Sequence, residues 1–206
     1  MQADWLAFKL GGIMMVPLSI LAILALAVMF EKAVLYWQYT RLPQTMADLL
    51  ESYEFDWEKL FSEMKNLNKN NYFYRFFNVI TENRSHPAWW IESRAADEAQ
   101  VIETTLSRRL WLLETTVTAA PLLGLMGTIA GMMHAFQLIG ANGLVNPTGV
   151  TGGVAQALIA TAVGLMIALV SLFGFNYFSR LQSQTLDEME RLGTRLIDRI
   201  RLDQQG

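Results

Sequence analysis

The stretch "GGVAQALIATAVGLMIAL", residues 152–169, decides how the rest of the chain is interpreted. It is long and apolar enough to cross a bilayer, yet it contains Gln156 and Thr161 and is rich in Gly and Ala. An amide in hydrocarbon needs hydrogen-bond partners within the protein, because no water is available there. Small residues let neighbouring helix backbones approach closely. The stretch therefore predicts a membrane helix that packs against other helices.

The distribution of charge predicts two more membrane helices. The chain has 206 residues, of which 52% are hydrophobic and 17% charged, and this composition is too apolar for an ordinary soluble domain. No charged residue occurs between Lys9 and Glu31, or between Glu114 and Arg180. The first gap fits one helix of about 20 residues. The second gap is too long for one helix and is interrupted by "GANGLVNPTG", so it fits two helices and a short loop. The predicted fold class is an all-α membrane protein with three transmembrane helices.

Lys and Arg predict the orientation of these helices. They are frequent between residues 41 and 109 and again from residue 180 onward, whereas the loop at 141–150 has none. Positive residues accumulate on the cytoplasmic side, so the N-terminus and this loop are expected outside. The expected order is a periplasmic N-terminus and first transmembrane helix (1–39), a cytoplasmic helical segment (40–112), a second transmembrane helix (113–140), a short periplasmic loop (141–150), a third transmembrane helix (151–179) and a cytoplasmic helical tail (180–206).

The cytoplasmic segment is divided by Pro43 and by "SHP" at 85–87. Between these breaks the sequence predicts short helices near 44–53, 57–67 and 70–83. The last of them contains "NNYFYRFFNVI", whose aromatic residues either pack against neighbouring helices or touch the membrane surface. Packing is the preferred interpretation.

Two longer helices are predicted to extend into the cytoplasm. From Ala88 to Thr118 no Pro or Gly interrupts a helix-favouring composition, so one unbroken helix is expected to run into the bilayer. In the tail, apolar residues recur every three to five positions, which predicts an amphipathic extension of the third transmembrane helix.

Both later spans carry small residues for close packing. The second span reads "TTVTAAPLLGLMGTIAGMMHAF" over 115–136, and Pro121 predicts a kink in it. The glycines expected to mediate close helix contacts are Gly124, Gly127 and Gly131 in the second span and Gly164 in the third. Three spans cannot bury this much small surface among themselves, so the sequence predicts a homo-oligomer.

Thr128 and Thr161 each lie on a stripe of small residues. One interpretation is that their hydroxyls bond to backbone carbonyls or to each other, as membrane hydroxyls commonly do. The other is that they face a lumen.

Two further polar side chains lie in the charge-free stretch. Gln156 is expected at a helix interface or at a hydrated pore entrance, and it lies about 140° around the helix from Thr161. His134 is either a pH-sensitive ligand or a hydrated histidine at the membrane interface, and the second interpretation is preferred.

The sequence also argues against several functions. It contains no Cys, and it has no catalytic constellation, cofactor motif or metal-ligand spacing. A net charge of −3 without a basic tract argues against nucleic-acid binding. The three spans contain no carboxylate, although proton paths through membranes normally depend on one. If protons pass, another chain must supply it.

The pair "APLLGLMGTIAGMMHAF" (120–136) and "GGVAQALIATAVGLMIALVSLFGFNYFSR" (152–180) resembles the MotA/TolQ/ExbB proton channel family, and most closely its ExbB and TolQ branch. The likeness is strong over about 115–180. MotA itself has four spans and a larger charged cytoplasmic region, so a flagellar stator is not expected.

The resemblance implies a bacterial inner-membrane motor subunit. Five three-span subunits would surround the helices of an ExbD-like or TolR-like dimer, whose single Asp titrates. Thr128 and Thr161 match the pore-lining threonines of the family beside that Asp. Proton motive force would then move the inner dimer, which acts on a TonB-like or TolA-like protein in the periplasm.

One residue departs from the family pattern. ExbB and TolQ commonly have Glu where this chain has Gln156, and an amide cannot exchange a proton, so a role for that position as a proton carrier is in doubt. A non-conducting membrane scaffold is the alternative function. An ion channel complete by itself is a third, weakened by the missing intramembrane charge.

Overall fold

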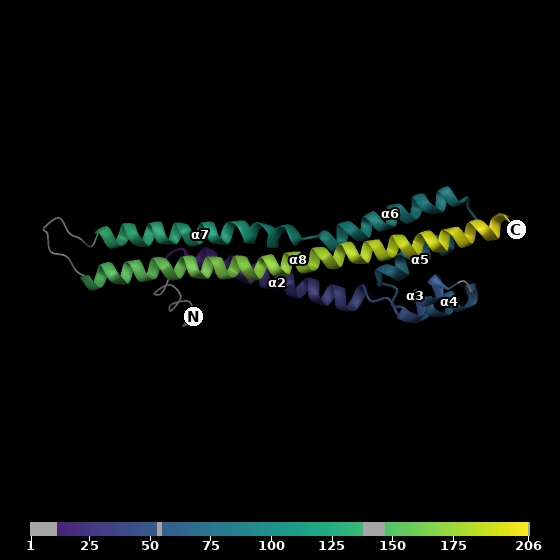
Figure 1. Cartoon of the computed structure of the whole chain (residues 1–206), viewed down its shortest axis with the longest axis horizontal. Helices are drawn as coiled ribbons and strands as arrows, with labels where there is room; N and C mark the ends of the chain where they lie inside the picture. Colours follow the sequence, from purple (N-terminus) through teal and green to yellow (C-terminus); the bar gives the residue numbers. More distant parts are fainter. Residues whose placement is uncertain (1–11, 53–54, 138–146, 206) are drawn as a thin grey trace. The chain divides into compact units, whose positions relative to one another are not determined.

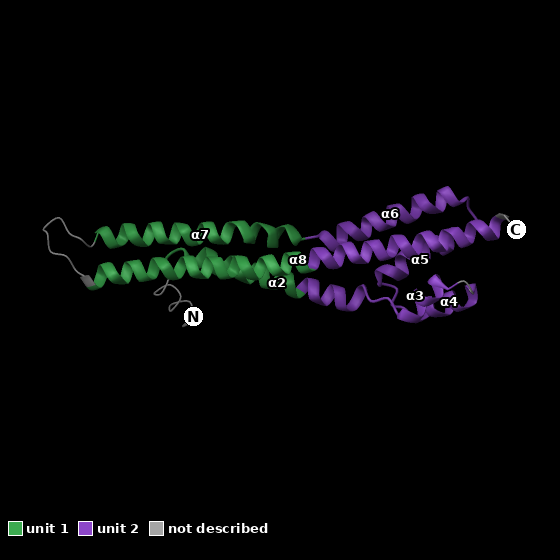
Figure 2. Ribbon diagram, viewed as in Figure 1, with its two compact units in different colours: residues 1–30, 109–177 green, residues 31–108, 178–206 purple. Residues whose placement is uncertain are grey.

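The computed structural model describes residues 12–52, 55–137 and 147–205, and these form helices joined by short connections, with no strand among them. The chain divides into two compact units (Figure 2). Unit 1 comprises Met1–Phe30 and Arg109–Tyr177, and unit 2 comprises Glu31–Arg108 and Phe178–Gly206. Figure 1 labels the helices: α2 (Met15–Tyr39), α3 (Gln44–Glu51), α4 (Trp57–Asn66), α5 (Tyr72–Glu82), α6 (Ala88–Ser107), α7 (Leu110–Gln137) and α8 (Pro147–Gln205).

Three helical stretches are long and apolar enough to cross a membrane: Met15–Tyr39, Ala88–Gln137 and Thr148–Gln204. This confirms the predicted all-α membrane fold with three spans. The predicted periplasmic N-terminus lies mostly outside the described residues, as does most of the predicted loop at 141–150.

Unit 1 is held together by contacts between backbones. A Cβ at Gly127 would lie 2.6 Å from the Cβ of Ala160, and a Cβ at Gly164 would lie 2.5 Å from the carbonyl oxygen of Ala120. Real Cβ atoms do not approach other atoms so closely, so only glycine permits α7 and α8 to pack at this distance. A smaller core of Leu18, Ala120 and Ala168 joins α2 to this pair.

Unit 2 has a conventional hydrophobic core. The short helices begin where local capping is available, because the Asp56 side chain accepts a hydrogen bond from the Glu58 N–H and Asn71 accepts one from the Phe73 N–H. They agree with the predicted pieces to within two residues at each end. The buried residues of the short helices include Met46, Leu50, Leu60, Met64, Tyr72, Phe73, Phe76, Phe77 and Ile80. The longer helices add the buried residues Ile91 and Ile102 of α6 and Met189, Leu192, Leu196 and Ile200 of α8. The aromatic run over 70–80 therefore packs inside the unit, as preferred.

The expectation of one unbroken helix from Ala88 to Thr118 is wrong. Helix α6 ends at Ser107 and α7 begins at Leu110, with Arg109 in the left-handed region at φ 67°. A left-handed residue ends an α-helix, and its carbonyls then need other donors. Within unit 2 the Lys32 ammonium, only 1% exposed, donates to the carbonyl oxygen of Leu106 at 2.5 Å. The side chain of a residue 74 positions away thus caps the end of α6.

Candidate functional site

The α7–α8 interface of unit 1 places Thr161 directly on the neighbouring helix. Its hydroxyl donates to the carbonyl oxygen of Gly124 at 2.8 Å. The contact depends on the glycine, because a Cβ at Gly124 would lie 3.0 Å from the Cα of Thr161 and 3.1 Å from the carbonyl oxygen of Ala160. The third span therefore presents its hydroxyl to the backbone of the second.

Thr128 lies one helical turn beyond Gly124 on α7. Its hydroxyl donates to the carbonyl oxygen of Leu125 at 2.7 Å, and the residue is half-buried. Thr161 is also half-buried. Since residues four apart share a helix face, Thr128 lies one turn along α7 from the glycine that Thr161 contacts. Both hydroxyls bond to main-chain oxygens, Thr128 within its own helix and Thr161 across to the next.

The other predicted close-packing glycines lie along the same interface. A Cβ at Gly131 of α7 would be 2.7 Å from the Cβ of Ala157 of α8. One turn further along, the roles are reversed: a Cβ at Gly153 of α8 would be 2.9 Å from the Cβ of Ala135 of α7. Helix α7 continues through Pro121, which lacks the N–H that would bond to residue 117. The kink at Pro121 stays a prediction.

Gln156 precedes Thr161 by five residues on α8. It lines a pocket of about 340 Å³ together with His134 and Gly131 of α7 and the turn at Gly12–Met14. Gly12 has φ 73°, and a Cβ there would meet the Gln156 side-chain amide at 3.5 Å. The turn therefore lies against the amide and closes one side of the pocket. The sequence suggested polar roles for Gln156 and His134 separately but did not predict that they share a cavity.

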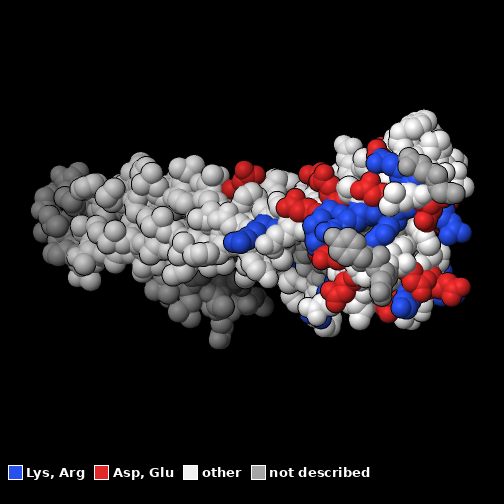
Figure 3. All heavy atoms as spheres, turned by 45° about the vertical axis from the view of Figure 1, so that its right-hand side comes forward, with Lys and Arg blue, Asp and Glu red and all other residues white. Residues whose placement is uncertain are grey.

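Charged side chains gather over unit 2 and leave unit 1 almost bare (Figure 3). Between residues 10 and 30 and between 115 and 179 the chain has no Lys, Arg, Asp or Glu. The side chains that line the α7–α8 interface consequently offer hydroxyls and an amide, but no carboxylate. No cluster of His, Asp and Glu with the geometry of a metal site occurs in the part of the chain that the structure describes.

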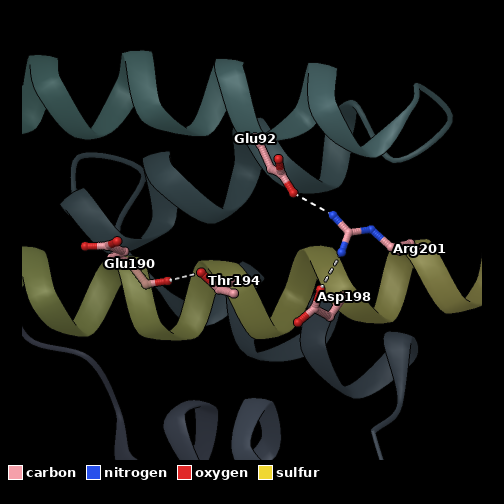
Figure 4. Close-up of polar contacts among 5 residues, drawn as sticks. All are labelled: Glu92, Glu190, Thr194, Asp198 and Arg201. Atoms are coloured by element: carbon pink, nitrogen blue, oxygen red, sulfur yellow. Dashed lines mark hydrogen bonds and ion pairs between the residues drawn. The ribbon is translucent and has the colours of Figure 1, made fainter.

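The polar contacts of unit 2 are structural. Arg201 of α8 bridges Glu92 of α6 at 2.7 Å and Asp198 at 3.1 Å, and Thr194 donates to the main-chain oxygen of Glu190 (Figure 4). Exposed ion pairs of this kind contribute at most about 1 kcal/mol each. The ion pairs join α6 to α8, and Glu92, Glu190 and Thr194 also line a pocket of about 510 Å³ in unit 2.

A second row of arginines on α8 holds the end of α3. Arg191 pairs with the Glu51 carboxylate, Arg195 donates to the Glu51 carbonyl oxygen at 3.3 Å, and Arg199 donates to that of Ser52 at 3.0 Å. These donors satisfy carbonyls that the end of the short helix leaves open.

These features define a helical multi-pass membrane protein in which the second and third spans pair through glycines, alanines and Thr161. The chain belongs to the MotA/TolQ/ExbB proton channel family, whose model matches residues 65–191. The match begins well before the segment that carries the resemblance in the sequence, so it includes α5 and α6. Members of this family act in channels and transport.

Individual relatives agree with this assignment. The chain is 32% identical over 177 residues to the biopolymer transport protein ExbB-like 3 of Synechocystis sp., covering 83% of this chain and 82% of the relative. ExbB-like 1 of the same organism is 33% identical over 197 residues, covering 92% and 76%. The biopolymer transport protein ExbB of Xanthomonas campestris pv. campestris is 38% identical over 106 residues, covering 51% and 42%.

Proposed function

We propose that this chain is the inner-membrane subunit of a proton-driven motor of the ExbB or TolQ type. Subunits form a ring, with five as the expected number, around the helices of an ExbD-like or TolR-like partner. Proton motive force acts on that partner, and the motion is passed to a TonB-like or TolA-like protein. The N-terminus and the loop after α7 face the periplasm, and unit 2 faces the cytoplasm.

The observation that carries this proposal is the bond from the Thr161 hydroxyl to Gly124, one helical turn along α7 from Thr128. Two half-buried hydroxyls at nearby levels of the carboxylate-free stretch 115–179 suit a surface that faces a titrating Asp on another helix. Hydroxyls both donate and accept hydrogen bonds, so they solvate that Asp in its charged and its neutral form. The proposal assigns the proton carrier to the partner and the wall of the path to this chain.

The test is proton flux in vesicles that contain the chain co-purified with a single-span partner. The double variant Thr128→Val and Thr161→Val keeps the shape of both side chains while removing both hydroxyls. Proton flux is expected to fall at least tenfold, because a tenfold change corresponds in free energy to about one lost charge-assisted hydrogen bond. Thr118→Val is the matched control, because its hydroxyl also donates within α7, to Thr115, and its side chain is exposed.

Each result decides between the candidate functions. Wild-type flux in the valine pair would refute the lumen assignment. A stable complex that carries no flux under any potential would favour the scaffold, and flux through the purified chain without a partner would favour a self-sufficient channel.

A further inference from the structure

The pocket in unit 1 contains the one histidine of the stretch between Glu114 and Arg180. His134 of α7 and Gln156 of α8 line it from two helices, and Gly12–Met14 line it from a third segment. The remaining wall is formed by Gly127, Ala130 and Gly131, which have no polar side chains. Among the described residues that face the pocket, His134 is therefore the sole titratable group. Thr128 and Thr161 do not line the pocket, but Gly127, which does, is adjacent to Thr128 in the chain, so the pocket lies next to the proposed path.

The dimensions and chemistry of the pocket suit water. A volume of about 340 Å³ holds several molecules, since each occupies about 30 Å³ in the liquid. An imidazole and an amide provide both donors and acceptors, which ordered water requires. The α7 wall consists of small residues, and at Gly131 a side chain is also excluded by Ala157 of α8, whose Cβ would lie 2.7 Å from a Cβ there.

We propose that His134 and Gln156 form a water-filled proton-exchange site, in which the imidazole performs the exchange that an amide at position 156 cannot. The ring nitrogen accepts a proton from hydronium in the pocket, giving imidazolium and water, and returns it to a second water molecule. Gln156 orients the water between them, and the turn at Gly12 fixes the amide. The role of this exchange in motor work rests on the proposed function, whereas the existence of the site does not.

The chain offers a direct test because it contains only two histidines. His86, which stacks on Trp90 in unit 2, is replaced by Asn to leave His134 as the single imidazole. Nitrogen-15 NMR of histidine-labelled protein in bilayers then follows exchange of the ring proton with water. The ring is expected to show a cross-peak to water, and Gln156→Leu is expected to weaken that cross-peak. A ring that shows no contact with water would overturn the site.

A second measurement places the site in the motor. Flux through the complex is compared for His134→Asn, which keeps a polar side chain that cannot titrate, and for the exchange His134→Leu with Met133→His, which moves the imidazole one position around α7. Both are expected to lose the pH dependence of wild-type flux, with a rate reduction on the order of tenfold or more. Unchanged pH dependence in both would overturn the role in transport. Loss of flux in the threonine variant alone would still support the proposed function, so the two failures are distinguishable.

Discussion

Single glycines determine whether α7 and α8 can pair. The hypothetical Cβ atoms at Gly124, Gly127 and Gly164 meet atoms of the facing helix at 3.0, 2.6 and 2.5 Å. At Gly164 the nearest atom is a backbone oxygen, which cannot rotate away as a side chain does. The same chain offers an internal comparison in Gly152, which has nothing within 4 Å of its Cβ position.

Gly164→Ala is therefore expected to destabilise the folded protein by about 1–3 kcal/mol, because the methyl group forces the two backbones apart. Thermal unfolding in mild detergent measures the effect, with Gly152→Ala as the control that leaves the midpoint nearly unchanged. Equal midpoints for the two variants would contradict the close approach of α7 and α8.

The stability of unit 2 is expected to fall at alkaline pH because of Tyr72. Burial raises the pKa of its phenol, an effect that nearby Tyr39 reinforces and Arg75 opposes. The folded state therefore prefers the neutral ring, so its contribution to stability is complete below the unfolded pKa of about 10 and is lost as pH rises through the higher folded value. Unfolding followed from pH 8 to 11 should show that Tyr72→Phe loses less stability than wild type above pH 10. Parallel curves would show that ionisation of this ring is not linked to folding.

At the scale of elements, α5 organises unit 2. Its buried face consists of Tyr72, Phe73, Phe76, Phe77 and Ile80, and Gly193 of α8 allows the ring of Phe76 to approach that helix closely. Arg75 on the same helix pairs with Glu98 of α6 at 2.6 Å. The element therefore connects to α6 and α8 through both apolar and polar contacts.

Replacing Phe77 by a smaller residue tests whether unit 2 depends on the core that α5 forms. The side chain is fully buried, so Phe77→Ala is expected to cost about 3–5 kcal/mol and to loosen unit 2. Hydrogen exchange measured residue by residue would report faster exchange in α4, α5 and α6. Val101→Ala, at a half-exposed position of α6, is the control. Protection that survives in the Phe77 variant would mean that unit 2 does not depend on this core.

The sequence predicted most elements because their signals are local. Asp56 and Asn71 begin helices, prolines separate them, and the spans follow from unbroken apolar runs. The break before α7 had no such signal, because Arg109 is not a glycine and the residue that caps α6 is Lys32, far away in the chain. The pocket was missed for the same reason, since it joins side chains from three distant segments. The glycines were expected at a helix contact because they recur at helical spacing on single spans, whereas the pore-lining role of Thr128 and Thr161 follows from the resemblance and stays a prediction.

At the scale of the whole molecule, the exposed surface of unit 1 is strongly apolar. Leu122, Met126 and Met133 of α7 and Leu158 and Met166 of α8 are each 50–63% exposed. Such side chains face either lipid or other subunits, and the small residues that remain between them favour close contact with neighbouring helices.

A ring of identical subunits is expected on this basis, and native mass spectrometry of the detergent-solubilised complex should count five copies of the chain. The same spectrum should contain a lighter partner with one transmembrane helix and an intramembrane Asp. A monomer that persists across mild detergents and bilayer nanodiscs would contradict the homo-oligomer.

The glycine contacts between α7 and α8 constrain how unit 1 can move. Where backbone touches backbone, there are no long side chains whose rotamer changes could absorb sliding. The Thr161 hydroxyl also links the two helices through its hydrogen bond to Gly124. Helices α7 and α8 are therefore expected to tilt or rotate together as one rigid pair. In the proposed motor, any movement of unit 1 is therefore expected at the edges of this helix pair, where side chains are larger and can change rotamer.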